Sequence, residues 1–113
     1  MQANAQSSHR HQDISPSAAY EARETALLID VREPFEFTGE LGHIPGATLV
    51  PLGTLERHLG RWDKDAAVIV ICRSGSRSTW AAQTLTRAGF RHVMNMAGGM
   101  IAYNAAKLPV ATT

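Results

Sequence analysis

Residues 66–78 read AAVIVICRSGSRS, an apolar run that ends at a cysteine and passes directly into a short basic loop. A short run rich in β-branched residues is typical of a strand buried on both faces of a parallel sheet. The next residues, Ser78 to Ala88, favour a helix. We therefore expect Cys72 at the carboxyl end of a buried strand and just before a helix amino terminus. Unpaired N–H groups and the positive end of the helix dipole gather there.

Cys72 is the only cysteine of the chain, and its setting indicates a chemical role. A free thiol has a pKa of about 8.5, but a helix amino terminus and nearby cations favour the thiolate. Arg73 and Arg77 supply such cations. The alternative is an ordinary buried thiol, because free cysteine often behaves as a small hydrophobe. The arginines, serines and glycine that follow Cys72 favour a nucleophile instead.

Strand and helix patterns alternate along the rest of the chain. Strands are expected at residues 13–14, 26–31, 47–50, 66–71 and 92–96, and helices at 15–24, 34–39, 52–62, 78–88 and 100–106. In the fourth helix, Trp80, Ala81 and Leu85 follow a helical apolar spacing. The alternation predicts an α/β domain with a mainly parallel sheet and helices on both faces. Asp30 and Arg32 then share the carboxyl edge of the sheet with the Cys72 loop, where such sheets bind ligands.

Composition narrows the class of protein. The chain has 113 residues, 44% hydrophobic and 19% charged, which predicts one domain. We expect a polar, disordered tail at 1–12, the domain at 13–110 and a short tail at 111–113. A net charge of +1 argues against nucleic-acid or membrane partners, and no segment is apolar enough to span a bilayer. A lone cysteine favours a reducing cytoplasm, and the two histidines at 9 and 11 have no further ligands beside them, so no metal is expected.

Four motifs resemble the rhodanese domain in their order and spacing. They are LIDVRE at 28–33, GHIPGA at 42–47, CRSGSRS at 72–78 and GGM at 98–100. The likeness extends from about residue 14 to residue 110 and implies a five-stranded, mainly parallel sheet with helices on each side. It also implies a single-domain sulfurtransferase that needs no cofactor, with Cys72 as the persulfide-forming cysteine. One departure is Tyr103, which stands where relatives often have tryptophan and is expected at the rim of the pocket.

The resemblance implies a double displacement. The Cys72 thiolate takes the outer sulfur of thiosulfate, sulfite leaves, and cyanide, a small thiol or a protein thiol removes the sulfur. The backbone N–H groups of residues 73–78 are expected to surround the persulfide, with Gly75 allowing the tight curl. Arg73 is expected to bind the sulfonate end of thiosulfate, or else to be a solvent-exposed charge.

The remaining site residues have two interpretations each. Arg77 either stabilises the sulfur anion or, as we favour, braces the loop against a carboxylate such as Asp30 or Glu33. The serines add hydroxyl donors or only suit a tight turn; they are Ser74, Ser76 and Ser78. Asp30 and Arg32 are expected to be structural, and His43 to shape its glycine- and proline-containing loop rather than to transfer protons.

Two other functions remain open. Cysteine phosphatases also use a loop that begins with cysteine and ends with arginine, but they place five residues between the two, whereas Cys72 and Arg77 enclose four. A phosphatase also requires a general acid, and no residue is obviously placed for one. The second alternative is a rhodanese-type persulfide carrier or a regulatory binding module with a dedicated protein partner. The physiological donor, the acceptor and the oligomeric state stay open.

Overall fold

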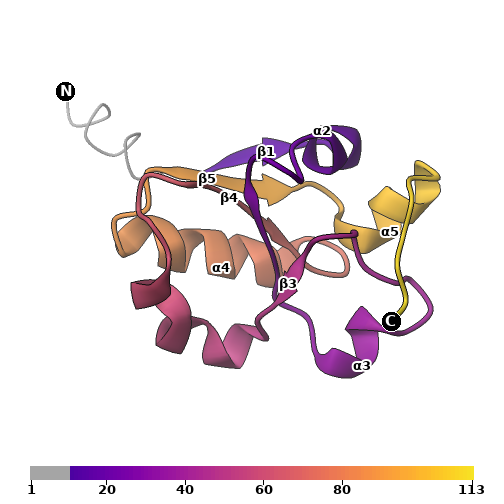
Figure 1. Ribbon diagram of the computed structural model, residues 1–113, viewed down its shortest axis with the longest axis horizontal. Coiled ribbons are helices and arrows are strands. Elements are labelled where there is room, and N and C mark those ends of the chain that lie inside the picture. Colours follow the sequence, from indigo (N-terminus) through magenta and orange to yellow (C-terminus); the bar gives the residue numbers. More distant parts are fainter. Residues whose placement is uncertain (1–10) are drawn as a thin grey trace.

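Five strands form one fully parallel sheet in the computed structural model, which describes residues 11–113 (Figure 1). The order across the sheet is β1-β5-β4-β2-β3, with β1 at Gln12–Ile14, β5 at His92–Met96, β4 at Ala67–Ile71, β2 at Leu27–Asp30 and β3 at Thr48–Leu49. Each neighbouring pair is parallel. The predicted α/β class, strand number and strand direction are therefore confirmed.

The central strand, β4, is the apolar run that precedes Cys72. Its residues from Val68 to Ile71 are fully buried, and each side chain of this size contributes on the order of 1.5–3 kcal/mol by leaving water. Val68 and Val70 face one core and Ile69 and Ile71 the other, because side chains alternate along a strand. A strand buried on both faces must be apolar throughout, so the continuous run identified it.

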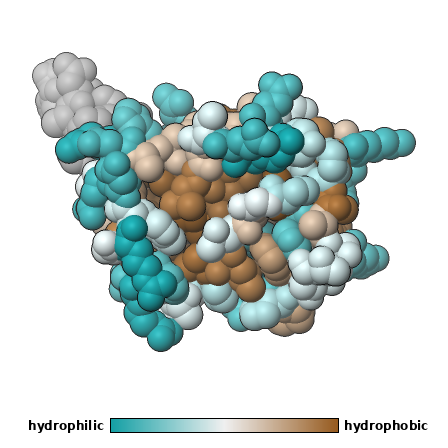
Figure 2. All heavy atoms as spheres, in the orientation of Figure 1, coloured by the Kyte–Doolittle hydropathy of each residue, from teal (hydrophilic) through white to brown (hydrophobic). Residues whose placement is uncertain are grey.

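Helices cover both faces of the sheet. They are α2 (Pro16–Glu21), α3 (Pro34–Phe37), η1 (Leu52–Arg61), α4 (Ser76–Arg87) and α5 (Gly99–Ala105). One core contains side chains of η1 and α4 and the other contains side chains of α2 and α5. Figure 2 shows a hydrophobic patch at the centre of one face of the molecule, bordered by hydrophilic residues.

Several expected helix features are wrong in detail. The segment that begins at Leu52 is a 3₁₀ helix, and α4 begins at Ser76, two residues before the predicted start at Ser78. Ala81 and Leu85 are buried as expected, but Trp80 is 63% exposed. The stripe that α4 buries consists of Ser78, Ala81, Ala82, Leu85 and Thr86. Two members of that stripe are polar, so apolar spacing alone did not reveal it.

The expected domain limits each move by one residue. Gln12 pairs with Met94 as part of β1, and Ala111 forms an isolated antiparallel bridge with His43. Both segments are held by backbone hydrogen bonds to the domain, which apolar patterns do not reveal. The sequence predicts a disordered tail that includes His9. Residues 1–10 of that tail lie outside the residues that the structure describes. None of the helices formed by residues 11–113 is long and apolar enough to cross a membrane.

Candidate active site

Cys72 follows β4 directly, and its side chain lies beneath the loop that leads into α4. The residue is only 1% exposed. Gly75 caps α4 with a φ of 116°, a left-handed value that side chains other than hydrogen strain to adopt. This turn directs the Gly75 N–H back to the Cys72 Sγ at 3.0 Å. The local fold therefore supplies a backbone donor to the sulfur.

Ser78 is the second group that contacts the sulfur. The Cys72 thiol donates to the Ser78 Oγ at 3.3 Å, and the Ser78 hydroxyl donates onward to the Gly75 carbonyl at 3.1 Å. That carbonyl also accepts from the Thr79 hydroxyl at 2.8 Å and the Thr79 N–H at 3.2 Å. When Cys72 ionises, the Ser78 hydroxyl can therefore turn to the thiolate while the Gly75 carbonyl keeps two donors.

The N–H donors of the loop are fewer than the sequence predicts. Within residues 11–113, the sulfur in its thiol form has the Gly75 amide and the Ser78 hydroxyl as hydrogen-bond partners. Ser74 and Ser76 are exposed. A full ring of amides around Sγ is therefore absent in this state, and Ser78 is the serine that the fold brings to the sulfur.

The amino terminus of α5 holds the other side of the loop. The Met100 N–H donates to the Cys72 carbonyl at 2.8 Å and the Ile101 N–H to the Arg73 carbonyl at 3.0 Å. Gly99 has a φ of 61° and lies so close to the loop that a Cβ would collide with the Arg73 backbone. This contact explains the second glycine of the GGM motif, whose role the sequence did not reveal.

Arg77 pairs with a carboxylate that the sequence did not identify. The predicted partners were Asp30 and Glu33, but the guanidinium donates to Glu36 through two bonds of 2.7 and 2.8 Å. The Asp30 carboxylate instead accepts hydrogen bonds from Arg32. Glu36 lies on α3 and accepts the Glu33 N–H at 2.9 Å in a capping box. That pattern of acidic residues three apart was the available signal.

The pair has a clear electrostatic signature. The Arg77 hydrogen bonds lower the pKa of Glu36 from 4.5 to about 2, against the opposing effect of partial burial. Hydrogen bonding to Glu36 likewise raises the pKa of Arg77 above its ordinary value. Glu36 thus neutralises the charge of Arg77, and the ion pair links the loop to α3.

Asp30 and Arg32 form a buried pair at the end of β2. Arg32 donates from Nε and Nη2 to the two carboxylate oxygens of Asp30 at 2.9 and 2.8 Å. It also donates to the carbonyls of Gly42 at 2.7 Å and Glu36 at 3.2 Å. Because further hydrogen bonds satisfy the guanidinium, the buried charge is tolerated. The pair ties β2 to α3 and to the loop that contains His43.

His43 and Tyr103 contact parts of the structure other than the sulfur. The His43 Nδ1 lies 2.8 Å from the Phe37 carbonyl, and the two rings stack with centroids 3.6 Å apart. Tyr103, expected at the pocket rim, is instead fully buried and donates to the Pro109 carbonyl at 2.5 Å. Burial raises its pKa to about 12. Neither ring lines the cavity beside the loop.

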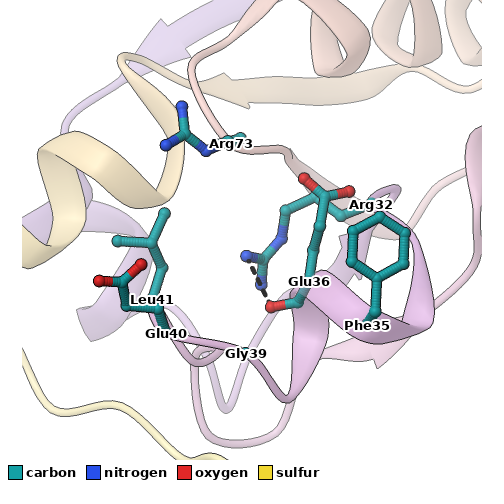
Figure 3. Close-up of a pocket in the computed structure, with 7 residues that line it drawn as sticks. All are labelled: Arg32, Phe35, Glu36, Gly39, Glu40, Leu41 and Arg73. Atoms are coloured by element: carbon teal, nitrogen blue, oxygen red, sulfur yellow. Dashed lines mark hydrogen bonds between the residues drawn. The ribbon is translucent and has the colours of Figure 1, made fainter.

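Arg73 is exposed and forms one wall of a cavity of about 180 Å³ (Figure 3). The opposite walls come from α3 and the segment after it. The site thus combines a sheltered sulfur, a hydroxyl that can change its acceptor, a braced loop and one exposed guanidinium. Among residues 11–113, no group of three or more histidine, cysteine, aspartate or glutamate side chains is arranged to hold a metal ion.

This combination defines an α/β domain with a cysteine-centred loop at the carboxyl edge of its sheet. The family model of the rhodanese-like domain matches residues 15–106. The chain belongs to the rhodanese-like domain family.

Named relatives and a solved structure agree with this assignment. The chain is 37% identical over 87 residues to a sulfurtransferase of Allochromatium vinosum, and the aligned region covers 77% of this chain and 79% of that protein. It is 39% identical over 77 residues to the putative sulfur carrier protein YrkF of Bacillus subtilis, covering 68% of this chain but only 40% of the relative. The crystal structure of a rhodanese-related protein from Thermoplasma volcanium matches with a TM-score of 0.82 at 27% identity, covering 91% of this chain and all of the other.

Proposed function

We propose that this protein is a sulfurtransferase that carries sulfane sulfur as a persulfide on Cys72. It takes the sulfur from thiosulfate or another persulfide donor and passes it to cyanide, a small thiol or a protein thiol. The reaction needs no metal or organic cofactor and takes place in the cytoplasm. The observation that carries the proposal is the Cys72 sulfur held between the Gly75 amide and the Ser78 hydroxyl. Family membership supports sulfur transfer as the class of reaction.

The reaction has two displacements. The Cys72 thiolate attacks the outer sulfur of thiosulfate, the S–S bond of thiosulfate breaks, and sulfite leaves with the electron pair. The acceptor then attacks the outer sulfur of the persulfide, and the Cys72 thiolate leaves. The Ser78 hydroxyl and the Gly75 N–H stabilise the Cys72 thiolate that attacks in the first step. In the second step the negative charge returns to Sγ as the thiolate leaves, and donors aimed at that developing charge lower the barrier.

The arginines have separate roles in this scheme. Arg73 is exposed at the cavity and binds the anionic end of the donor. Arg77 and Glu36 hold the loop, so Arg77 is a positioning residue. Asp30, Arg32 and His43 support the edge of the sheet through the contacts described above.

Loop size argues against the phosphatase alternative. The four residues between Cys72 and Arg77 make a smaller cradle than the five of cysteine phosphatases. Arg77 is also committed to Glu36 through both of its terminal nitrogens. A guanidinium engaged in this way is a poor ligand for a phosphate ester. Hydrolysis of a phosphate ester without sulfur transfer would reverse this choice.

Intact-mass analysis tests the proposal. Thiosulfate, or a persulfide donor, should add the mass of one sulfur atom to the protein, and cyanide should then remove it as thiocyanate. Cys72→Ser should show neither change while keeping the melting temperature of a folded domain. No sulfur adduct with any donor would refute the proposal.

A further inference from the structure

The cavity beside the loop has an unusual balance of charge. Four charged side chains line it, and they comprise two arginines and two glutamates. Arg32 and Glu36 already have partners, namely Asp30 and Arg77. In the part of the chain that the structure describes, Arg73 and Glu40 have no hydrogen-bonded or ion-paired side chain. One free cation and one free anion therefore remain for a ligand.

The two free charges stand on different walls, and apolar groups lie near them. Figure 3 shows Arg73 at the top of the cavity, Leu41 and Glu40 below it on the left, and Glu36 and Phe35 on the right. Phe35, 76% exposed on α3, forms a further apolar wall. A ligand in this cavity thus meets an arginine, a carboxylate and apolar surface together.

The size of the cavity sets limits on the ligand. Its volume of about 180 Å³ exceeds that of an engineered cavity of roughly 150 Å³ that admits benzene. Thiosulfate has fewer heavy atoms than benzene and contacts apolar walls poorly. As a dianion it also gains little from a lining whose charges cancel. The cavity is therefore larger and less cationic than thiosulfate requires.

We propose that the preferred sulfur donor is the persulfide of a zwitterionic, amino-acid-type thiol, whose carboxylate binds Arg73 and whose ammonium binds Glu40. The inference rests on the proposed function and names the substrate class of the same site. The apolar carbons of the donor contact Leu41 and Phe35. Thiosulfate is a poorer donor that uses Arg73 alone.

The transfer step is balanced without any further reactant. The Cys72 thiolate attacks the outer sulfur of the donor persulfide, and a new S–S bond forms at Sγ. The S–S bond of the donor breaks, and its electron pair stays on the inner sulfur. The donor leaves as a thiolate, which then takes up a proton. Because one S–S bond forms and one breaks, no net oxidation occurs.

A comparison of matched donors tests the inference. Cysteine persulfide carries the ammonium, whereas the persulfide of 3-mercaptopropionic acid has the same carboxylate without it. The rate of Cys72 loading is measured by intact mass in a single turnover and divided by the rate of each donor with a free reference thiol. We expect cysteine persulfide to load the protein at least tenfold faster than either the other persulfide or thiosulfate.

Variants assign the preference to Glu40. Glu40→Gln should lower the preference for cysteine persulfide about tenfold, which corresponds to about 1.4 kcal/mol and is typical of one charge-assisted hydrogen bond. Loading by the anionic persulfide should rise, because a negative charge has left the cavity. Glu24→Gln removes an exposed carboxylate outside the cavity and should change neither rate.

The outcomes separate the two proposals. An unchanged preference in Glu40→Gln, or a wild-type protein that loads equally well from all three donors, overturns the assignment of the donor class. In either case Cys72 still becomes loaded, and the proposed function survives. Failure of all three donors to load Cys72 overturns the proposed function itself.

Discussion

The ion pair between Glu36 and Arg77 allows a quantitative prediction for Glu36→Gln. Glutamine keeps the size of the side chain and one hydrogen bond to Arg77 but removes the charge. A carboxyl pKa of about 2 in place of 4.5 corresponds to an upper limit of about 3–4 kcal/mol at 1.36 kcal/mol per pKa unit. Arg77 is 35% exposed, and solvent screening reduces the expected loss to about 1–2 kcal/mol at pH 7.

The pH dependence follows from the direction of the shift. The pKa of Glu36 is lower in the folded state, so its stabilising contribution is complete above the unfolded pKa of about 4.5. It is lost as the pH falls toward about 2. Wild type and Glu36→Gln should therefore differ most near neutral pH and converge progressively below pH 4.5.

Urea denaturation between pH 3 and pH 7 measures this difference, and the melting temperature should fall by roughly 4 °C per kcal/mol. Asp65→Asn is the matched control, because it breaks an exposed ion pair with Arg91. The Arg91 and Asp65 side chains are 62% and 67% exposed, respectively. That change should cost less than about 0.5 kcal/mol. A loss in Glu36→Gln no larger than in the control, or one that stays constant down to pH 3, would contradict the assigned role of the pair.

Three further substitutions test the loop. Ser78→Ala should slow both iodoacetamide alkylation and persulfide formation about tenfold at pH 7, because the sulfur anion loses its hydroxyl donor; equal rates would mean that Ser78 only shapes the turn. Gly99→Ala should destabilise the domain by about 2–3 kcal/mol in urea, because its Cβ meets the Arg73 backbone at a left-handed φ. Gly53→Ala, where the added Cβ meets nothing within 4 Å, should be near neutral, and a similar cost at both sites would refute this explanation. Arg73→Ala should lower the second-order rate of loading from thiosulfate about tenfold with an unchanged melting temperature, and unchanged kinetics would remove Arg73 from the site.

The central strand and the position of Cys72 at its end follow from local patterns. β4 is buried on both sides, so each of its residues had to be apolar, and the break at Cys72 marked the carboxyl edge of the sheet. The expected helix at 15–24 likewise starts where the structure has it, since Ser15 caps α2 and its hydroxyl accepts the Ala18 N–H at 3.1 Å. These features depend on residues that are close in the chain or on a regular hydrophobic period.

The partners within the site depend on contacts between distant segments. Glu36 and Arg77 are 41 residues apart, and a choice among three nearby carboxylates requires the orientation of α3. The buried stripe of α4 includes Ser78, whose hydroxyl contacts the Cys72 sulfur. A polar side chain therefore occupies a buried position where the helical spacing predicts an apolar residue. Trp80 lies outside this stripe and is exposed.

The amino-acid sequence alone was enough to predict a parallel α/β sheet and a cysteine at its carboxyl edge. Burial and backbone geometry make apolar residues recur along strands and helices in patterns that can be recognised in the sequence. The tertiary structure was needed to select Glu36 as the partner of Arg77, Ser78 as the hydroxyl that contacts the sulfur and Gly99 as the residue packed against the loop. Contacts between segments that are distant in the chain depend on side-chain direction and close packing, and these produce no recurring pattern in the sequence.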